Sequence, residues 1–296
     1  MATLPDILVL GGGGRQADAW LTGVLAGLED TGDLQLQNCE YFVGTSAGAV
    51  VAARLATGER LERPASRVGG AISGVGGPAS GEQSPLPNWA ASSAMAIAAP
   101  LARLGLGLGI LPGEIARATA LRFVPASTVE ALDFRASFPP RRTRFDGRLR
   151  AVAVDRNTGR RVVFGAPGAP RAKVAEAVAA SCAIPLVFAP VTISGSEYVD
   201  GAVWSPTNAD VAPVDREAQV LILNPTGSYF GPLSLPIRAA SRAAMLLEAS
   251  ALIGRGARVR IITPDRISAA SIGSELMSVA RLEQTLAAGY SQGLAL

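Results

Sequence analysis

The sequence predicts an α/β fold, a three-layer α/β/α sandwich built around a mainly parallel sheet. Two short apolar segments, residues 7–10 and 41–43, have the length expected of buried strands. Each is followed by a glycine-containing turn and then by apolar residues at helical spacing. This repeated order of strand, turn and helix is typical of a parallel sheet with helices on its faces.

The two predicted units occupy the N-terminal part of the chain. The Ile-Leu-Val-Leu strand at residues 7–10 ends at a run of four glycines, and the apolar spacing over residues 17–28 predicts a helix. The second strand, residues 41–43, runs into Gly-Thr-Ser-Ala-Gly, and an alanine-rich helix is predicted over residues 47–56. Both glycine-rich turns therefore follow directly from predicted strands.

A long segment of unusual composition follows. Residues 64–88 are rich in glycine, proline and serine and have no period, which predicts a long loop. Residues 86–113 carry one charge, Arg103, but Pro100 and several glycines interrupt them, so they fit a membrane-spanning helix poorly. We expect a variable cover region at about residues 64–113, either a buried helix with a loop, or a mobile lid or interfacial segment.

The alternation of strands and helices continues to the end of the chain. Strands are predicted over residues 149–154, 161–164, 187–193, 219–223 and 259–263. Helices are predicted over residues 171–181, 237–253 and 274–290. Asn157-Thr158-Gly159 predicts a hairpin turn between the first two of these strands. No repeat or linker divides the chain, so we expect one domain over residues 1–296.

Composition excludes several classes of protein. Hydrophobic residues make up 49% of the chain and charged residues 17%, which excludes intrinsic disorder. The net charge of +3 indicates no more than a weak preference for anionic surfaces. Cys39 and Cys182 are too few for a disulfide framework, and the N-terminal residues lack the pattern of a secretory signal. We therefore expect a cytoplasmic protein.

The most informative count is that of histidine, which is zero. A Ser-His-Asp triad and a histidine-ligated zinc site are both excluded. Yet Gly44-Thr45-Ser46-Ala47-Gly48 is a G-x-S-x-G sequence between a predicted strand and a predicted helix. Gly44 and Gly48 allow a sharp turn that exposes the Ser46 hydroxyl at a helix N-terminus. Small residues at such turns also serve packing, which is the competing interpretation.

A serine without histidine needs another base. Asp200 stands at a predicted strand end in Val199-Asp200-Gly201-Ala202, where Gly201 allows a tight turn. By itself this aspartate would be read as a turn or cap residue. Together with Ser46 and the absence of histidine, it becomes the candidate base.

The glycine run after the first strand is the third candidate element. Gly12, Gly13 and Gly14 can present backbone N–H groups to a developing oxyanion or to a phosphate. Gly12-x-Gly14-x-x-Ala17 also fits a permissive dinucleotide-binding pattern. That pattern requires an acid at the end of the next strand, where this chain has Gly44, so nucleotide binding is the weaker interpretation.

The order of Leu-Val-Leu-Gly-Gly-Gly-Gly, Gly-Thr-Ser-Ala-Gly and Asp-Gly-Ala resembles the patatin-like phospholipase family, whose members pair a serine directly with an aspartate. Two further segments are similar to that family, one from Asp155 and one from Ala177 that ends ahead of Asp200. The likeness covers residues 6–57 and 150–205. Many members carry a basic residue and then a glycine after the glycine run, whereas this chain has Arg15-Gln16-Ala17.

The resemblance implies an acyl hydrolase of the phospholipase A or lysophospholipase type that works through an acyl-serine. Ser46 and Asp200 would form the catalytic dyad, and the amides of Gly12, Gly13 and Gly14 would form the oxyanion hole. It implies no metal, no cofactor and no nucleic-acid partner, but a lipid or acyl-ester substrate and peripheral contact with membranes. An acyltransferase or thioesterase with the same dyad, and a catalytically weak lipid-binding protein, remain alternatives. In the family-like segment the position of Cys182 requires only a small residue, so the resemblance implies no nucleophilic role for this cysteine. The sequence does not predict the oligomeric state.

Overall fold

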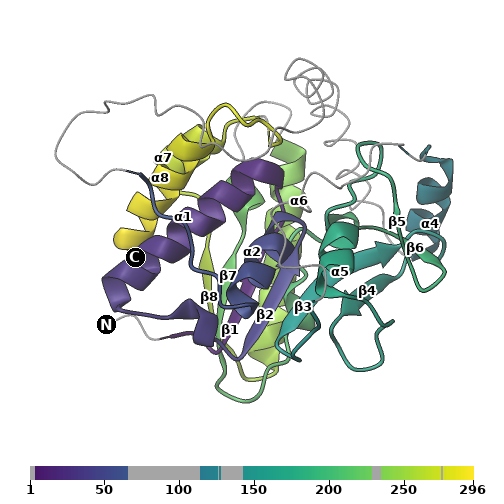
Figure 1. Cartoon of the computed structure of the whole chain (residues 1–296), viewed down its shortest axis with the longest axis horizontal. Helices are drawn as coiled ribbons and strands as arrows, with labels where there is room; N and C mark the ends of the chain where they lie inside the picture. Colours follow the sequence, from purple (N-terminus) through teal and green to yellow (C-terminus); the bar gives the residue numbers. More distant parts are fainter. Residues whose placement is uncertain (1–3, 66–113, 126, 128–142, 229–234, 275) are drawn as a thin grey trace.

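A computed structural model describes residues 4–65, 114–125, 127, 143–228, 235–274 and 276–296. From residue 66 on, the predicted cover region at 64–113 lies outside the described residues. The described part is a mixed sheet with helices on both faces, so the predicted three-layer α/β/α fold is confirmed (Figure 1).

Five neighbouring strands of the sheet are parallel. They are β3 (Leu149–Asp155), β2 (Tyr41–Thr45), β1 (Ile7–Leu10), β7 (Gln219–Leu223) and β8 (Arg258–Ile262), paired in that order. Three further strands are antiparallel to their partners: β4 (Arg161–Phe164), β5 (Val191–Ile193) and β6 (Ser196–Asp200). Both β4 and β6 pair with β3, and β5 pairs with β6.

Alternate residues of the strands divide the core into two halves. Leu8 and Leu10 of β1 join one hydrophobic cluster with residues of α1 (Gly14–Gly32), α2 (Ala47–Ala56) and α5 (Val174–Ser181). Ile7 and Val9 belong to a second cluster that contains Met245, Ala249 and Leu252 of α6 (Leu235–Gly254). The period of two along a strand thus places α1, α2 and α5 on one face and α6 on the other (Figure 1).

Helix α1 packs closely against α8 (Leu282–Leu294). A side chain at Gly23 would come within 2.2 Å of the Leu286 carbonyl oxygen, so glycine permits the close approach of the two backbones. Trp20 Nε1 donates to Gln292 Oε1 at 2.9 Å across this interface. The C-terminal helix is thereby fixed against the helix that begins at the glycine run.

The predicted elements are largely found, with four differences. The strand predicted over residues 187–193 begins only at Val191, because Pro190 lacks the N–H that a ladder needs. The helix predicted over residues 274–290 is wrong in its bounds: α7 (Arg266–Ile272) ends at Gly273, whose φ is +64°, and α8 starts at Leu282. Helix α4 (Glu114–Phe123) is not predicted from the sequence, and of strand β6 only the end at Asp200 is predicted.

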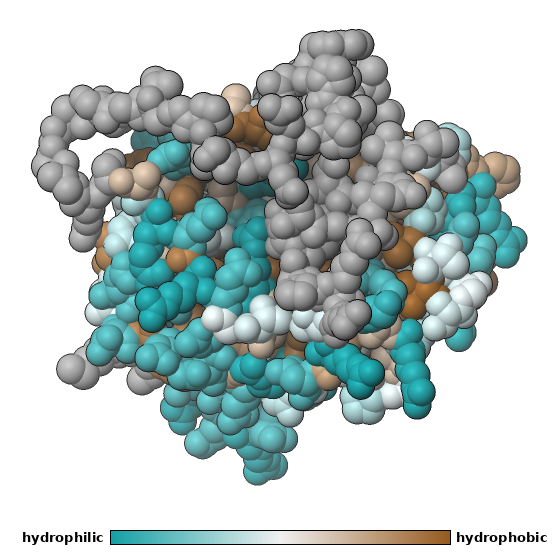
Figure 2. Space-filling view, viewed as in Figure 1, coloured by the Kyte–Doolittle hydropathy of each residue, from teal (hydrophilic) through white to brown (hydrophobic). Residues whose placement is uncertain are grey.

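The surface of the described residues shows scattered apolar side chains (Figure 2). Large hydrophobic residues that are exposed are Ile115, Phe123, Leu246, Leu247, Ile253, Ile267, Val279 and Leu296. None of the described helices is long and apolar enough to cross a membrane.

Candidate active site

The ends of β2 and β6 meet on one edge of β3. Thr45, the last residue of β2, pairs with Val152 of β3, and Asp200, the last residue of β6, pairs with the next residue, Ala153. The opposite edge of β3 is taken by β4, because Ala153 also pairs with Val162. Strand β2 is parallel to β3 and β6 is antiparallel, so the two strands point at each other. Residues that follow Thr45 therefore lie beside Asp200.

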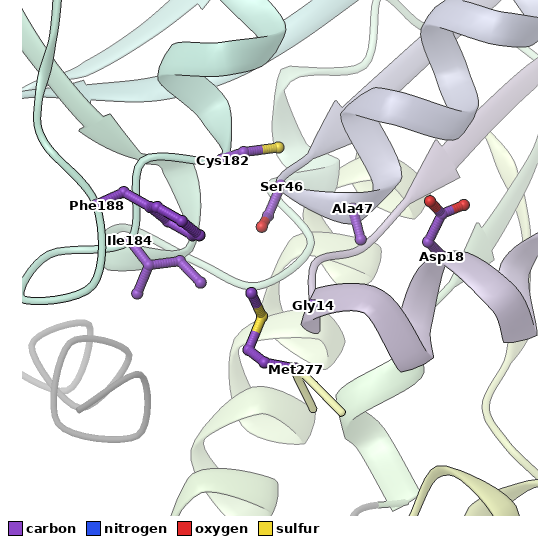
Figure 3. Close-up of a pocket in the computed structure, with 8 residues that line it drawn as sticks. All are labelled: Gly14, Asp18, Ser46, Ala47, Cys182, Ile184, Phe188 and Met277. Atoms are coloured by element: carbon purple, nitrogen blue, oxygen red, sulfur yellow. The ribbon is translucent and has the colours of Figure 1, made fainter. Parts of the chain in front are cut away.

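Ser46 is held in a strained turn directly after β2. Its φ of 52° and ψ of −122° are unusual for a residue with a side chain, and its side chain is nearly buried. A Cβ on Gly44 would lie 2.4 Å from Ala49 Cα, and one on Gly48 would lie 1.9 Å from the Leu10 carbonyl oxygen. Both glycines of the G-x-S-x-G sequence are thus required by space. The Ser46 hydroxyl points into a pocket at the N-terminus of α2 (Figure 3).

Ser181, at the end of α5, fixes the backbone of this turn. The Ser46 amide donates to Ser181 Oγ at 2.9 Å, and Ser181 Oγ donates in turn to the Val152 carbonyl oxygen at 2.6 Å. Ser181 is fully buried. The strained serine is therefore tied to β3, the strand that β2 and β6 share.

Asp200 is fully buried, and one of its carboxyl oxygens is unsatisfied. Oδ1 accepts a hydrogen bond from the Ala202 amide at 2.8 Å, whereas Oδ2 has no hydrogen-bond partner among the residues that the structure describes. Burial raises the pKa of Asp200 from 3.8 to about 7, although the Ala202 amide and the nearby Ser46 hydroxyl favour the charged form. A carboxyl group with a pKa near neutrality is suited to accept a proton.

The glycine run lies against the serine. A Cβ on Gly12 would lie 3.0 Å from Ser46 Cβ, so Gly12 leaves room for the serine. The Gly12 amide donates to the Pro206 carbonyl oxygen at 2.8 Å and is occupied in this conformation. Gly13, with a φ of 151°, and Gly14, with a φ of 69°, begin α1. Within the described part of the chain, neither of their amides makes a hydrogen bond.

The pocket at Ser46 is narrow and mostly apolar (Figure 3). Its lining residues are Gly14, Asp18, Ser46, Ala47, Cys182, Ile184, Phe188 and Met277. The free volume, about 10 Å³, is close to the room that one water molecule needs. A ligand larger than water can enter only after some of the lining side chains move.

Asp18 and Cys182 are the polar groups of this pocket besides Ser46. Asp18 Oδ1 accepts from Arg54 Nη1 at 3.2 Å and from Thr22 Oγ1 at 3.3 Å, while burial raises the pKa of its carboxyl group. Burial, reinforced by the charge of Asp200, raises the pKa of the Cys182 thiol well above its usual value. Since the thiolate is the reactive form, this raised pKa argues against Cys182 as a nucleophile.

The Arg15-Gln16-Ala17 segment, where the family pattern is altered, has a structural role. Gln16 is fully buried; its Nε2 donates to the Ser278 carbonyl oxygen at 2.7 Å, and its Oε1 accepts from Thr285 Oγ1 at 2.6 Å. The Gln16 amide also donates to the Leu276 carbonyl oxygen at 3.0 Å. These bonds hold the segment that carries Met277 over the pocket. Sequence reasoning missed both Met277 and Asp18, because only the folded chain brings residues 18, 46 and 277 together.

Two other acidic residues near strand ends, Asp155 and Asp210, make contacts away from Ser46. Asp155 Oδ1 accepts from the amides of Asn157 and Thr158 in the predicted hairpin turn, at 3.0 and 2.8 Å. Asp210 forms a bidentate pair with Arg161. Asp200 is the acid that the strand register places beside Ser46. The described residues contain no cluster of three acidic or cysteine side chains that could hold a metal ion.

Comparison with known proteins gives a family. The model of the patatin-like phospholipase family matches residues 8–213, a range that includes the glycine run, Ser46 and Asp200. Among solved structures, one match is the crystal structure of VipD from Legionella pneumophila, with 16% sequence identity and a TM-score of 0.43. That match covers 99% of this chain and 67% of VipD. No curated protein matches the sequence.

Proposed function

Because the chain belongs to the patatin-like phospholipase family, we propose that it is a lipid acyl hydrolase with Ser46 as nucleophile and Asp200 as general base. The observation that carries this proposal is the meeting of β2 and β6 on β3. It places a serine in a strained turn next to a buried carboxyl group that has an unsatisfied oxygen and a pKa of about 7.

The chemistry proceeds in two half-reactions. Asp200 accepts the proton of the Ser46 hydroxyl while Ser46 Oγ attacks the ester carbonyl carbon. The tetrahedral intermediate collapses, and the alcohol leaves with the proton that Asp200 held. Water then gives a proton to Asp200 and attacks the acyl-serine, which releases the fatty acid and returns the proton to Ser46.

The oxyanion of each tetrahedral intermediate needs donors. The amides of Gly13 and Gly14 serve in our proposal, because no hydrogen bond engages them within the described residues. One such donor contributes on the order of 3 kcal/mol to stabilisation of the transition state. Gly12 is the third donor expected from the sequence, but its amide already donates to the Pro206 carbonyl oxygen. Its role in our proposal is to leave room for the Ser46 side chain.

The pocket supports an acyl ester as substrate. Ala47, Ile184, Phe188 and Met277 offer apolar surface to an acyl chain next to Ser46. Phospholipids and lysophospholipids are the first substrates to test, and such substrates imply contact with a membrane or micelle surface. Binding without catalysis is disfavoured, because a binding protein has no need for a strained Ser46.

The test compares the wild-type protein with Ser46→Ala and with Ser250→Ala, a control on the exposed face of α6. The substrates are a phospholipid, a lysophospholipid, a short soluble ester and an acyl thioester, and a fluorophosphonate labels the nucleophile. We expect ester turnover and labelling in wild type and Ser250→Ala, and neither in Ser46→Ala. Full activity in Ser46→Ala would refute the proposal. Release of product only with an added alcohol acceptor would indicate an acyltransferase.

A further inference from the structure

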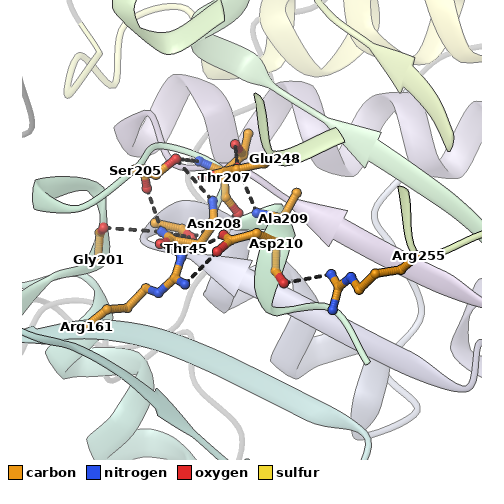
Figure 4. A network of polar contacts seen from close by, with 10 residues as sticks. All are labelled: Thr45, Arg161, Gly201, Ser205, Thr207, Asn208, Ala209, Asp210, Glu248 and Arg255. Atoms are coloured by element: carbon orange, nitrogen blue, oxygen red, sulfur yellow. Dashed lines mark hydrogen bonds and ion pairs between the residues drawn. The ribbon is translucent and has the colours of Figure 1, made fainter. Parts of the chain in front are cut away.

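The loop that follows Asp200 connects several segments of the candidate site (Figure 4). It runs over residues 201–211 and contains two 3-10 turns, Gly201–Val203 and Ala209–Val211. At one end it adjoins Asp200. Further along, the Pro206 carbonyl oxygen accepts the Gly12 amide at 2.8 Å. The loop therefore contacts both the base and the glycine run.

Asn208 links this loop to the strand that carries the serine. Its side chain is fully buried, and Nδ2 donates to Thr45 Oγ1 at 3.1 Å and to the Gly201 carbonyl oxygen at 3.2 Å. Thr45 immediately precedes Ser46, and Gly201 immediately follows Asp200. One amide group thus bridges the two segments from which the nucleophile and the base project (Figure 4).

The orientation of the Asn208 side chain is itself fixed. Its backbone is left-handed, with φ 50° and ψ 36°, a conformation that asparagine tolerates better than most residues. Nδ2 also donates to the Ser205 carbonyl oxygen, so its two N–H groups are shared among three acceptors. Oδ1 accepts from Arg161 Nη1 at 3.2 Å. Arg161 is held in place by its bidentate pair with Asp210, at 2.7 and 2.6 Å. The flanking contacts leave the amide one orientation.

A buried acid on the opposite helical layer secures the loop. Glu248 of α6 accepts from Thr207 Oγ1 at 2.5 Å and from the Ala209 amide at 2.8 Å, on both sides of Asn208. Glu248, Thr207 and Ala209 are all buried, and burial raises the pKa of the Glu248 carboxyl group. Asn208 therefore projects from a loop that is anchored to α6, toward the junction of β2 and β6.

We propose that Asn208 is a positioning residue that sets the separation of Ser46 and Asp200 through its bonds to Thr45 and Gly201. This inference rests on the proposed function of that pair. Neither bonded atom belongs to a reacting group, so Asn208 acts through its neighbours. A misplacement of about 1 Å between reacting groups can cost about 100-fold in rate, so loss of the bridge should be visible in turnover.

Matched variants of Thr45 test the bridge with little change in volume. Thr45→Val removes Oγ1, which accepts the Asn208 bond and donates to the Thr207 carbonyl oxygen of the same loop at 3.4 Å, but it keeps a β-branched side chain in the strand. Thr45→Ser keeps the hydroxyl group and serves as the control. Asn208→Asp keeps the shape of the side chain but replaces the bridging donor with an oxygen. Each variant is assayed on the soluble ester and with the fluorophosphonate, well below its melting temperature.

We expect Thr45→Val to lower kcat and the labelling rate by about 10-fold to 100-fold with KM within about twofold, and Thr45→Ser to stay within about threefold of wild type. Asn208→Asp should show the same fall in kcat. A lower melting temperature with unchanged kcat in the folded protein would mean that Asn208 only stabilises the loop, and would overturn the inference. If Thr45→Val does not fold, Asn208→Asp decides by the same criterion, and failure of both to fold counts against a positioning role. An inactive wild-type protein would instead refute the proposed function.

Discussion

Asp200→Asn tests the proposed general base and the cost of burying its charge in one substitution. The amide keeps the size of the carboxyl group and can still accept from the Ala202 amide, but it cannot take the Ser46 proton. General-base loss is typically worth about 100-fold to 10,000-fold in rate. We therefore expect ester turnover and fluorophosphonate labelling to fall by that factor.

The same substitution should stabilise the protein at alkaline pH. The folded pKa of Asp200 is about 7 against 3.8 for the ordinary side chain, so the folded protein holds this proton more tightly than the unfolded chain does. The contribution of this group to the free energy of unfolding is therefore fully present below the pKa of the unfolded chain, and it is lost as pH rises through the pKa of the folded protein. Three pKa units correspond to about 4 kcal/mol, of which roughly 2 to 3 kcal/mol is lost between about pH 5 and about pH 8.

Asparagine escapes this loss because it has no charge to bury. The Nδ2 atom of the asparagine would take the place of Oδ2, which already has no hydrogen-bond partner among the described residues. The number of unsatisfied polar atoms therefore stays the same, and the substitution should cost little stability on that account. Urea denaturation at about pH 5 and about pH 8 measures the effect. We expect the variant to gain on the order of 2 kcal/mol over wild type between the two pH values.

Two results would contradict this reasoning. Parallel pH dependence of stability in wild type and Asp200→Asn would mean that the carboxyl group is not buried with a raised pKa. Activity within a few-fold of wild type would exclude Asp200 as the base. Asp155→Asn is the matched control for activity and should remain active, because the Asp155 carboxylate accepts hydrogen bonds in the hairpin turn.

Two further predictions concern the same pocket. Under the proposed mechanism Asp200 reacts as the carboxylate, so kcat/KM of the wild-type protein should rise with pH to a plateau above a midpoint near 7; a pH–rate profile that is flat from about pH 5 to about pH 9 would contradict this. Met277→Ala should open the pocket and raise the ratio of kcat/KM for long over short acyl esters, by up to about fourfold per added methylene. Met277→Leu conserves the volume of the side chain and should leave this ratio unchanged. A chain-length series measures that ratio, and equal ratios in both variants would exclude Met277 from the acyl site.

The sequence predicts best what local chemistry determines. Strand β1, strand β2 and the turn at Ser46 follow from short apolar runs that end in glycines, and the structure places them where the pattern predicts them. The hairpin at Asn157 likewise depends on neighbouring residues. In each case the decisive contacts lie within a few positions of one another, so the pattern alone identifies them.

Contacts between distant residues could not be predicted in this way. Strand β6 has the sequence Ser-Glu-Tyr-Val-Asp, which offers no long apolar run, and its pairing with β3 depends on tertiary contacts. The bonds of Gln16 to Ser278 and of Asn208 to Thr45 join residues 262 and 163 positions apart. Polar side chains of this kind read as surface residues until the fold shows that they are buried.

The end-to-end meeting of β2 and β6 also has a consequence for biosynthesis. Ser46 is translated long before Asp200, and the two become neighbours only when both strands have paired with β3. Under the proposed mechanism, a nascent chain that has released β2 but not β6 contains a nucleophile without its base. Such a chain cannot yet cleave an ester. Under the same mechanism, hydrolytic competence arises only after β6 has paired with β3 and the loop that contains Asn208 has bonded to Thr45.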